Sequence, residues 1–342
     1  MDHDAEITSF IAGLPKAELH VHMQGAASAE TILALSRKYP DEGLPQDEAA
    51  MREFYRFTDF ANFISVYVAA SRLVRTGDDI YQLAVGLGRD LATVNVRYAE
   101  ATVTADSHLR VGIAPDELAD ALNRGRADAL AASGVELAWV YDIDGDFGIP
   151  SGERTLAWAA QHRPDGSIGF GIGGREVGVP RGDFADLFRR ATDIGLQSLP
   201  HAGETVGPDQ VWSAIDQLGA KRVGHGLAAA QDPALMAALA ERGIALEICP
   251  TSNICTKAVP DLASHPFPIL REAGVRLTLN TDDPGMFGTN LNNEYHIGHE
   301  VFGLDRADLA DLAAESVRAS FAPDATRAMV LAEIDAYVQT AP

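Results

Sequence analysis

Histidines and acids that could bind a metal gather in four short segments of this chain. They are His20-Val21-His22, His201-Ala202-Gly203-Glu204, Gly224-His225-Gly226 and Asn280-Thr281-Asp282-Asp283-Pro284. In the first segment the imidazoles are two residues apart, and a β-strand points side chains with this spacing to the same face. Three neutral imidazoles and one carboxylate are a ligand set that suits zinc and leaves room for a water molecule. We therefore expect a zinc site that lowers the pKa of water to about 7 and makes hydroxide available at neutral pH.

Each of these segments ends a stretch that has the composition of a β-strand. Eight such stretches alternate with amphipathic helical patterns, a succession typical of a parallel sheet with helical crossovers. Eight strand-helix units close a barrel, whereas the alternative, a doubly wound open sheet, usually has about five to seven strands. We therefore predict an α/β fold of the TIM (β/α)8 barrel class with its site at the C-terminal strand ends. The predicted strands are Ala17–His22, Asn95–Val103, Val135–Asp142, Ser167–Ile172, Leu196–His201, Lys221–His225, Ile244–Cys249 and Val275–Asn280.

The series of predicted elements is continuous, without a Ser/Gly-rich linker or an internal repeat. We therefore expect residues 1–342 to form one metallo-hydrolase domain. Residues 25–94, between the first two strands, have the pattern of a helical insertion, which in a barrel lies over the catalytic face. Residues 291–342 follow the last strand and are predicted to be mostly helical.

Composition limits the partners that the chain can bind. Its 342 residues are 46% hydrophobic, enough for a large core. The net charge of −22, from 49 acidic and 27 basic residues, argues against nucleic acid or an anionic membrane and favours a small neutral or cationic substrate. The two cysteines, an acidic N-terminus and the lack of an 18-residue apolar run predict a cytoplasmic protein. The sequence does not indicate an oligomeric state.

Two further patterns carry acids or glycines that could imitate other sites. In a related class of barrel enzymes, a carbamylated lysine at the end of strand four bridges two metal ions. The fourth predicted strand of this chain runs into Gly169–Gly174 and contains no lysine, so we expect one metal. Asp142-x-Asp144-x-Asp146 resembles a calcium loop, but Phe147 occupies the position that requires glycine. We interpret these acids as part of a solvated loop after the third strand.

Taken together, five segments resemble the adenosine deaminase family of metal-dependent amidohydrolases. They occur in the family's order and are Lys16–His22, His201–Glu204, Gly224–Gly226, Cys249–Asn253 and Asn280–Pro284. The resemblance implies a TIM barrel and a hydrolase that replaces the exocyclic amino group of an adenine-type purine by oxygen, releasing ammonia. It also implies that one zinc ion is held by His20, His22, His201 and Asp282.

The same resemblance implies roles for residues around the metal. Glu204 would exchange a proton with the ring nitrogen beside the attacked carbon. His225 would orient the hydroxide and accept its proton, as an imidazole can near neutral pH. Asp283 would share a hydrogen with the five-membered ring, and the backbone of Gly174 would contact the opposite ring edge.

Gln24 departs from the family pattern, because the adenosine-specific branch usually has an aspartate at this position. In that branch the aspartate helps to hold the ribose 5′-hydroxyl, so we expect Gln24 to contact the part of the substrate beyond the base. The expected substrates are, in order, adenosine or a 5′-modified adenosine, then aminodeoxyfutalosine, then free adenine.

Two other classes of function remain open from the sequence. A zinc amidase or lactonase could use the same hydroxide on the same barrel, and assays of purines against cyclic amides would separate the two. A binding protein without turnover is the second alternative. Such a protein would ordinarily have lost a ligand, whereas every expected zinc ligand is present here.

Overall fold

Parallel strands form the centre of the computed structural model, which describes residues 3–56 and 60–341. They pair in chain order, β1 to β5 in one sheet and β6 to β9 in another. All the pairings between neighbours are parallel. The strands are β1 (Lys16–His22), β2 (Val96–Val103), β3 (Glu136–Asp144), β4 (Ser167–Gly173), β5 (Gln197–Ser198), β6 (His201–Ala202), β7 (Arg222–His225), β8 (Ala245–Ile248) and β9 (Leu277–Leu279).

β5 and β6 are two halves of one barrel strand. The Leu199 amide between them donates to the Phe170 carbonyl at 2.9 Å, and the Pro200 carbonyl accepts from the Gly224 amide at 3.0 Å. The hydrogen bonds to β4 and β7 thus continue across the gap. The prediction of an unbroken strand over Leu196–His201 is wrong at its centre, because proline has no N–H to donate to a neighbour.

The barrel closes between β1 and the chain just after β9. The His22 amide donates to the Asp282 carbonyl at 2.8 Å, and the Asp282 amide donates to the His20 carbonyl at 2.9 Å. With β5 and β6 counted as one strand, eight parallel strands surround a common centre. The predicted (β/α)8 class is confirmed, and the closing hydrogen bonds belong to residues that were predicted as metal ligands.

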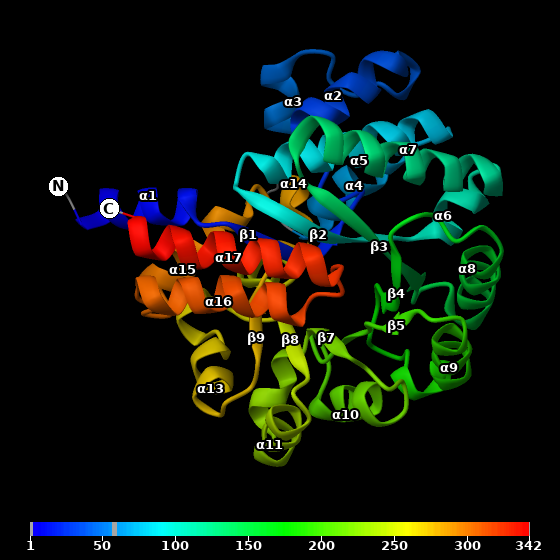
Figure 1. Ribbon diagram of the computed structural model, residues 1–342. Coiled ribbons are helices and arrows are strands. Elements are labelled where there is room, and N and C mark those ends of the chain that lie inside the picture. The colour runs from blue at the N-terminus through cyan, green and yellow to red at the C-terminus, as the bar shows by residue number, and fades with distance from the viewer. Residues whose placement is uncertain (1–2, 57–59, 342) are drawn as a thin grey trace.

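Helices surround the strands on the outside (Figure 1). Those that follow successive strands are α7 (Pro115–Ser133), α8 (Gly148–His162), α9 (Ala185–Asp193), α10 (Pro208–Asp216), α11 (Pro233–Arg242), α13 (Phe267–Glu272) and α16 (Arg306–Ala319). α11 shows why the sequence forms a helix there. Asp232 accepts from the Ala234 and Leu235 amides, Pro233 begins the helix and Gly243 ends it in a left-handed conformation.

The segment between β1 and β2 is helical, as was expected for residues 25–94. It contains α2 (Ala29–Lys38), α3 (Glu48–Phe54), α4 (Phe60–Ser71) and α5 (Gly77–Ala92). α5 packs along α7, while α2 and α3 project beyond the barrel at the top of Figure 1. The insertion therefore adds a helical layer beside the strand ends that carry the candidate site.

The remaining helices lie in loops or at the chain ends. They are α1 (His3–Gly13), α6 (Ala105–Arg110), α12 (Pro250–Cys255), α14 (Pro284–Phe287), α15 (Leu291–Glu300) and α17 (Asp324–Thr340). α1 and α17 lie side by side (Figure 1), with the Phe10 and Tyr337 rings 5.5 Å apart. Among the described residues, no helix has both the length and the apolar character needed to cross a lipid bilayer.

A buried ion-pair network lies inside the barrel, around Arg222 at the start of β7. Its Nε donates to Glu247 Oε1 at 2.6 Å, and its Nη1 donates to the Ala319 carbonyl at 2.8 Å. Its Nη2 pairs with Glu100. A buried guanidinium is tolerated when its donors are paired in this way. Arg222 therefore joins β2, β7 and β8 at the barrel's centre.

Candidate metal centre and active site

Three histidines and one aspartate meet at the C-terminal strand ends. His20 and His22 lie on β1, His201 begins β6 and Asp282 follows β9, and one ligand atom of each lies within 4.8 Å of the others. His22 Nε2 is 3.2 Å from both His201 Nε2 and Asp282 Oδ1, and His20 Nε2 is 3.5 Å from Asp282 Oδ1. Tetrahedral zinc ligands with bonds of about 2.0 Å lie about 3.3 Å apart. These residues therefore fit a single metal ion.

Buried side chains orient these ligands. His20 Nδ1 pairs with Glu247 Oε2 at 2.9 Å, while the buried His20 Nε2 faces Asp282 Oδ1 at 3.5 Å. Ser252 donates to Asp282 Oδ2 at 2.6 Å, which turns Oδ1 toward the imidazoles. Such contacts fix the ring orientation of a metal-binding histidine and raise its basicity. The sequence reasoning missed Glu247, which has no metal-binding pattern around it.

The site favours protons or metal cations on His20. Burial lowers the pKa of His20, but the bonds to Asp282 and Glu247 outweigh burial and raise this pKa to about 10. Burial likewise raises the pKa of Asp282, while the bonds to His20 and His22 hold it well below its usual range. A metal ion that binds here must therefore displace protons from the imidazoles.

Glu204 and His225 lie next to the metal ligands. Thr256 donates to Glu204 Oε1 at 2.8 Å, and Glu204 Oε2 is 3.6 Å from His225 Nε2. Burial, followed by the charge of Asp282, raises the pKa of Glu204 to about 7. Glu204 is thus partly protonated at neutral pH and can both donate and accept a proton.

A chain of hydrogen bonds fixes the tautomer of His225. The Phe267 amide donates to His265 Nδ1 at 3.1 Å, so the neutral ring carries its proton on Nε2. This Nε2 lies 3.2 Å from Asn253 Oδ1, and Asn253 Nδ2 lies 3.1 Å from His225 Nδ1. Burial lowers the pKa of both histidines to about 4, which keeps them neutral. His225 therefore presents an Nε2–H donor to the site.

Asp283 lies on the other side of the site. Its Oδ1 is buried and has no partner among the described residues. Burial, followed by repulsion from Asp282, raises the pKa of Asp283 to about 7. A Cβ on Gly25 would lie 1.5 Å from Asp283 Oδ1, so only glycine at this position leaves room for the carboxyl group. The arrangement gives a protonatable oxygen that is free for a ligand.

The two other residues predicted to contact substrate are Gly174 and Gln24. Gly174 follows β4 with a φ of 72°, and its amide has no hydrogen-bond partner among residues 3–56 and 60–341. Gln24 follows β1, and its Nε2 bonds to Ser71 Oγ in α4. Ser71 in turn donates to the Tyr67 carbonyl at 2.7 Å. Gln24 therefore connects the strand that carries two histidines to the helical insertion.

A carboxylate that the sequence reasoning missed holds the loop of Glu204. Glu176, in the loop after β4, accepts from the amides of Gly203 at 2.7 Å, Glu204 at 3.0 Å and Thr205 at 2.7 Å. The neighbouring Arg181 donates from Nε to the His201 carbonyl at 2.7 Å. Three N–H donors on one buried carboxylate fix the loop backbone. No spacing in the sequence marks this role, because it depends on contacts between two loops.

The interpretation of Asp142 as part of a solvated loop is wrong. Asp142 lies within β3 and is 3% exposed, because this strand continues to Asp144. A Cβ built on Gly173 would lie 2.9 Å from Asp142 Oδ2 and 3.8 Å from Cε1 of His22 and of His201. Burial raises the pKa of Asp142 to about 6. Asp142 therefore borders the metal ligands.

Comparison with known sequences finds one family along nearly the whole chain. The family described as adenosine deaminase matches residues 15–337. The chain is 49% identical to the aminodeoxyfutalosine deaminase of Streptomyces avermitilis over 97% of this chain and 93% of that protein. It is 37% identical to the adenine deaminase of Chelativorans sp., covering 96% of this chain and all of that protein.

Solved structures show the same architecture. An adenine deaminase from Arthrobacter aurescens superposes with a TM-score of 0.89 at 30% identity, over 96% of this chain and 100% of that one. An amidohydrolase from Burkholderia ambifaria with bound Zn superposes with a TM-score of 0.88 at 28% identity, over 99% and 96%.

Proposed function

This chain belongs to the adenosine deaminase family, and we propose that its substrate is a 5′-modified adenosine, aminodeoxyfutalosine. The chain is a purine aminohydrolase that hydrolytically deaminates an adenine-type purine. One observation carries the choice of substrate. Identity is 49% to an aminodeoxyfutalosine deaminase but 37% to an adenine deaminase. The sequence-based order put adenosine or a 5′-modified adenosine first, and this comparison favours the 5′-modified compound.

Gln24 supports a substrate that differs from adenosine beyond the base. Gln24 bonds through Nε2 to Ser71, so this side chain holds α4 and offers no carboxylate to a ribose hydroxyl. A site built to bind a hydroxyl with an acid rejects analogues that lack that hydroxyl. An uncharged amide at the same place tolerates replacement of the 5′-hydroxyl by another group.

We propose zinc as the metal and His20, His22, His201 and Asp282 as its ligands. Zinc prefers this mixture of nitrogen and oxygen donors, and the Burkholderia ambifaria relative contains bound Zn. A metal ion held there supplies Lewis acidity that lowers the pKa of water to about 7 and makes hydroxide available.

Glu204 and Asp283 act on the purine ring. Glu204, with a pKa of about 7, donates its proton to the ring nitrogen beside the attacked carbon. The resulting carboxylate takes the proton of the new hydroxyl group and passes it to the amino group, which leaves as ammonia. Asp283, with its free Oδ1, holds the five-membered ring, and the Gly174 amide holds the opposite edge.

His225 stabilises the incoming oxygen by donating a hydrogen bond from Nε2. The resemblance to the family suggested that it accepts a proton. The hydrogen bonds through His265 and Asn253, in which His225 Nδ1 accepts from the Asn253 amide, support a donor role for Nε2 instead. A donor aimed at developing negative charge lowers the barrier to addition. Removing this donor would lower turnover without removing a metal ligand.

The two other function classes are not favoured. A zinc amidase or lactonase would use the same hydroxide, but the relatives described above are named purine deaminases. A binding protein without turnover would have lost ligands, whereas all four lie together here. We further infer a cytoplasmic enzyme with a small-molecule partner, which is supported by two unpaired cysteines and a net charge of −22.

Side-by-side assays test the substrate. kcat/KM for aminodeoxyfutalosine should exceed that for adenosine and for adenine by at least about 10-fold. Gln24→Asp should shift the preference toward adenosine, because it restores an acid for the 5′-hydroxyl. Adenine as the best substrate of the wild-type enzyme would overturn this proposal and leave the chemistry of deamination intact.

A further inference from the structure

A cavity opens at the opposite end of the barrel from the metal ligands. Its volume is about 500 Å³, within the range of small-molecule sites. It lies where β7, β8 and β9 begin and where α16 ends. Six of its lining residues are cationic, namely Lys221, Arg222, Arg242, Arg276, Arg318 and Arg327. We call this cavity the basic pocket.

The charge of the basic pocket is opposite to that of the chain. None of its fifteen lining residues is acidic, although the chain as a whole has a net charge of −22. The cations come from separate elements, so they do not form one basic helix or one basic stretch of sequence. Converging cations in a concave surface focus a positive potential and attract anions.

Some of these cations have carboxylate partners outside the lining. Arg242 pairs with Asp216 at 2.6 Å, and Arg276 pairs with Glu315 at 2.5 Å. Exposed pairs of this kind contribute little energy and leave guanidinium donors free. The side chains of Lys221 and Arg318 are exposed and have no ion-pair or hydrogen-bond partner among the described residues. They are the cations most available to a ligand.

Arg222 forms the floor of the basic pocket and is already paired. Its three nitrogens bond to Glu247, Ala319 and Glu100, so it lies fixed beneath the other cations. Phe321 lies above it, with the guanidinium carbon 4.9 Å from the ring centre. The pocket therefore has a rigid base and a partly apolar wall. The hydrogen-bond donors that a ligand could use come from the exposed cations.

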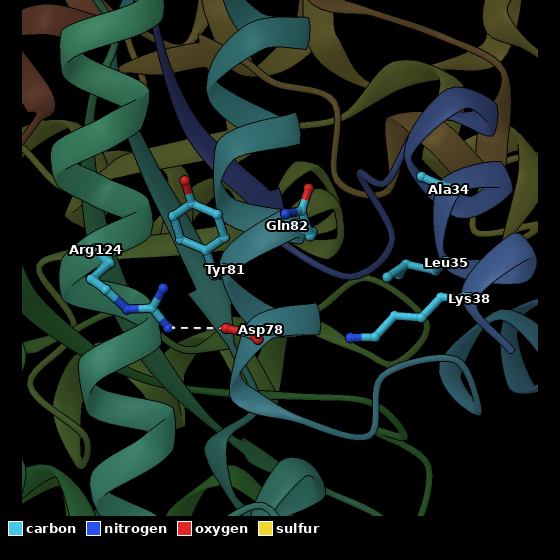
Figure 2. Close-up of a pocket in the computed structure, with 7 residues that line it drawn as sticks. All are labelled: Ala34, Leu35, Lys38, Asp78, Tyr81, Gln82 and Arg124. Carbon is cyan, nitrogen blue, oxygen red and sulfur yellow. Dashed lines mark hydrogen bonds and ion pairs between the residues drawn. The ribbon is translucent and has the colours of Figure 1, made fainter.

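A pocket between α2, α5 and α7 provides an internal comparison (Figure 2). It has a volume of about 390 Å³ and also contains one lysine and one arginine, Lys38 and Arg124. Both are neutralised, Lys38 by Asp79 at 2.6 Å and Arg124 by Asp78 and Asp120 at 3.3 and 2.8 Å. Lys38 and Arg124 therefore leave no unpaired positive charge in this pocket, in contrast to the basic pocket.

We propose that the basic pocket binds a small, multiply charged anion that carries phosphate groups. Guanidinium forks match phosphate oxygens in pairs, and Lys221 adds a compact charge with three donors. A single negative charge would leave one of the two cations without a carboxylate partner, Lys221 or Arg318, unmatched. The volume admits an anion larger than one phosphate group. This site is separate from the deaminase centre, and its existence does not depend on the substrate proposed above.

Calorimetric titration of the metal-loaded enzyme with inorganic pyrophosphate and with citrate tests the proposal. Pyrophosphate should bind the wild type, and more tightly than citrate. Lys221→Ala/Arg318→Ala should raise the dissociation constant for pyrophosphate at least about 10-fold, since two charge-assisted contacts are lost. Lys38→Ala/Arg124→Ala is the matched control, because it also removes one lysine and one arginine from a pocket, and it should bind like the wild type.

Each result of the titration distinguishes loss of the anion site from loss of folding or from binding elsewhere. Unchanged turnover of the purine that the wild-type enzyme deaminates fastest would show that Lys221→Ala/Arg318→Ala is folded, since neither residue belongs to the catalytic site. Equal affinity in all three proteins would mean that pyrophosphate binds elsewhere, for example at the metal, and would overturn the proposal. Citrate binding as tightly as pyrophosphate would overturn the phosphate specificity, and no binding to the wild type would overturn the site itself.

Discussion

The two ends of the barrel hold charge in opposite ways. At the C-terminal strand ends, histidines and carboxyl groups are buried close together, and Asp283 Oδ1 has no hydrogen-bond partner among the described residues. At the other end, the buried Arg222 has all its nitrogens paired, whereas the Lys221 and Arg318 side chains, without an ion pair among the described residues, are exposed. Buried unpaired polar atoms are costly, so they persist where a ligand completes them. The catalytic end should therefore be far more sensitive to substitution than the basic pocket.

Glu247 is where the two ends meet. One of its oxygens pairs with His20 and the other accepts from Arg222. Burial raises the pKa of Glu247, but Arg222 and His20 outweigh burial and lower it to about 2. The carboxylate is therefore ionised at any pH at which the enzyme works.

Glu204→Gln should have the largest effect among residues that do not bind the metal. The amide cannot donate and then recover a proton, so kcat should fall about 10²-fold or more while metal content stays unchanged. Steady-state assays and elemental analysis measure the two quantities. Turnover at the wild-type rate would remove Glu204 from the mechanism.

Glu247→Gln should weaken metal binding by about 10- to 100-fold, the usual effect of losing an outer partner of a ligand. Competition with a chelator measures the metal affinity. Glu315→Gln, which changes the partly buried partner of Arg276, is the control and should leave the metal affinity unchanged. If both variants lose metal equally, orientation of His20 by Glu247 is not the cause.

The pH profile of kcat/KM should fall on the alkaline side of about pH 7. Burial and Asp282 raise the pKa of Glu204 to about 7, and only the protonated form donates to the ring, so activity is lost as pH rises through this value. Each pH unit above it should cost about tenfold. Asp283 titrates in the same range, with a pKa of about 7. If the alkaline fall in kcat/KM persists unchanged in Glu204→Gln, then Asp283 and not Glu204 is the group that titrates.

Glu176→Ala should have a smaller effect, shared between stability and turnover. Three amide donors lose their acceptor, so the free energy of unfolding should fall by about 1–3 kcal/mol. Because these amides position Glu204, kcat should fall more than KM rises. Glu176→Gln, which keeps acceptor oxygen, should recover part of kcat. A loss of stability with normal kinetics would make Glu176 purely structural.

The sequence predicts the parts of this molecule that follow from local pattern. Strand composition located the barrel, and the period of β1 placed His20 and His22 on one face. Local pattern does not predict contacts between distant segments. Glu247 and His20 are 227 residues apart, and Glu176 binds amides of another loop. Asp142 was misjudged because a strand end cannot be located to the residue from composition. The cations of the basic pocket are scattered along the chain, so only the fold reveals their convergence.

Metal analysis of wild-type and Asp282→Ala protein tests the central claim most directly. Four residues from β1, β6 and the end of β9 should hold about one zinc ion per chain, which activates water for deamination. We expect about one zinc per wild-type chain, and the loss of both zinc and ammonia release in Asp282→Ala. Active wild-type protein without bound metal, or an Asp282→Ala variant that keeps its metal and its activity, would contradict this account.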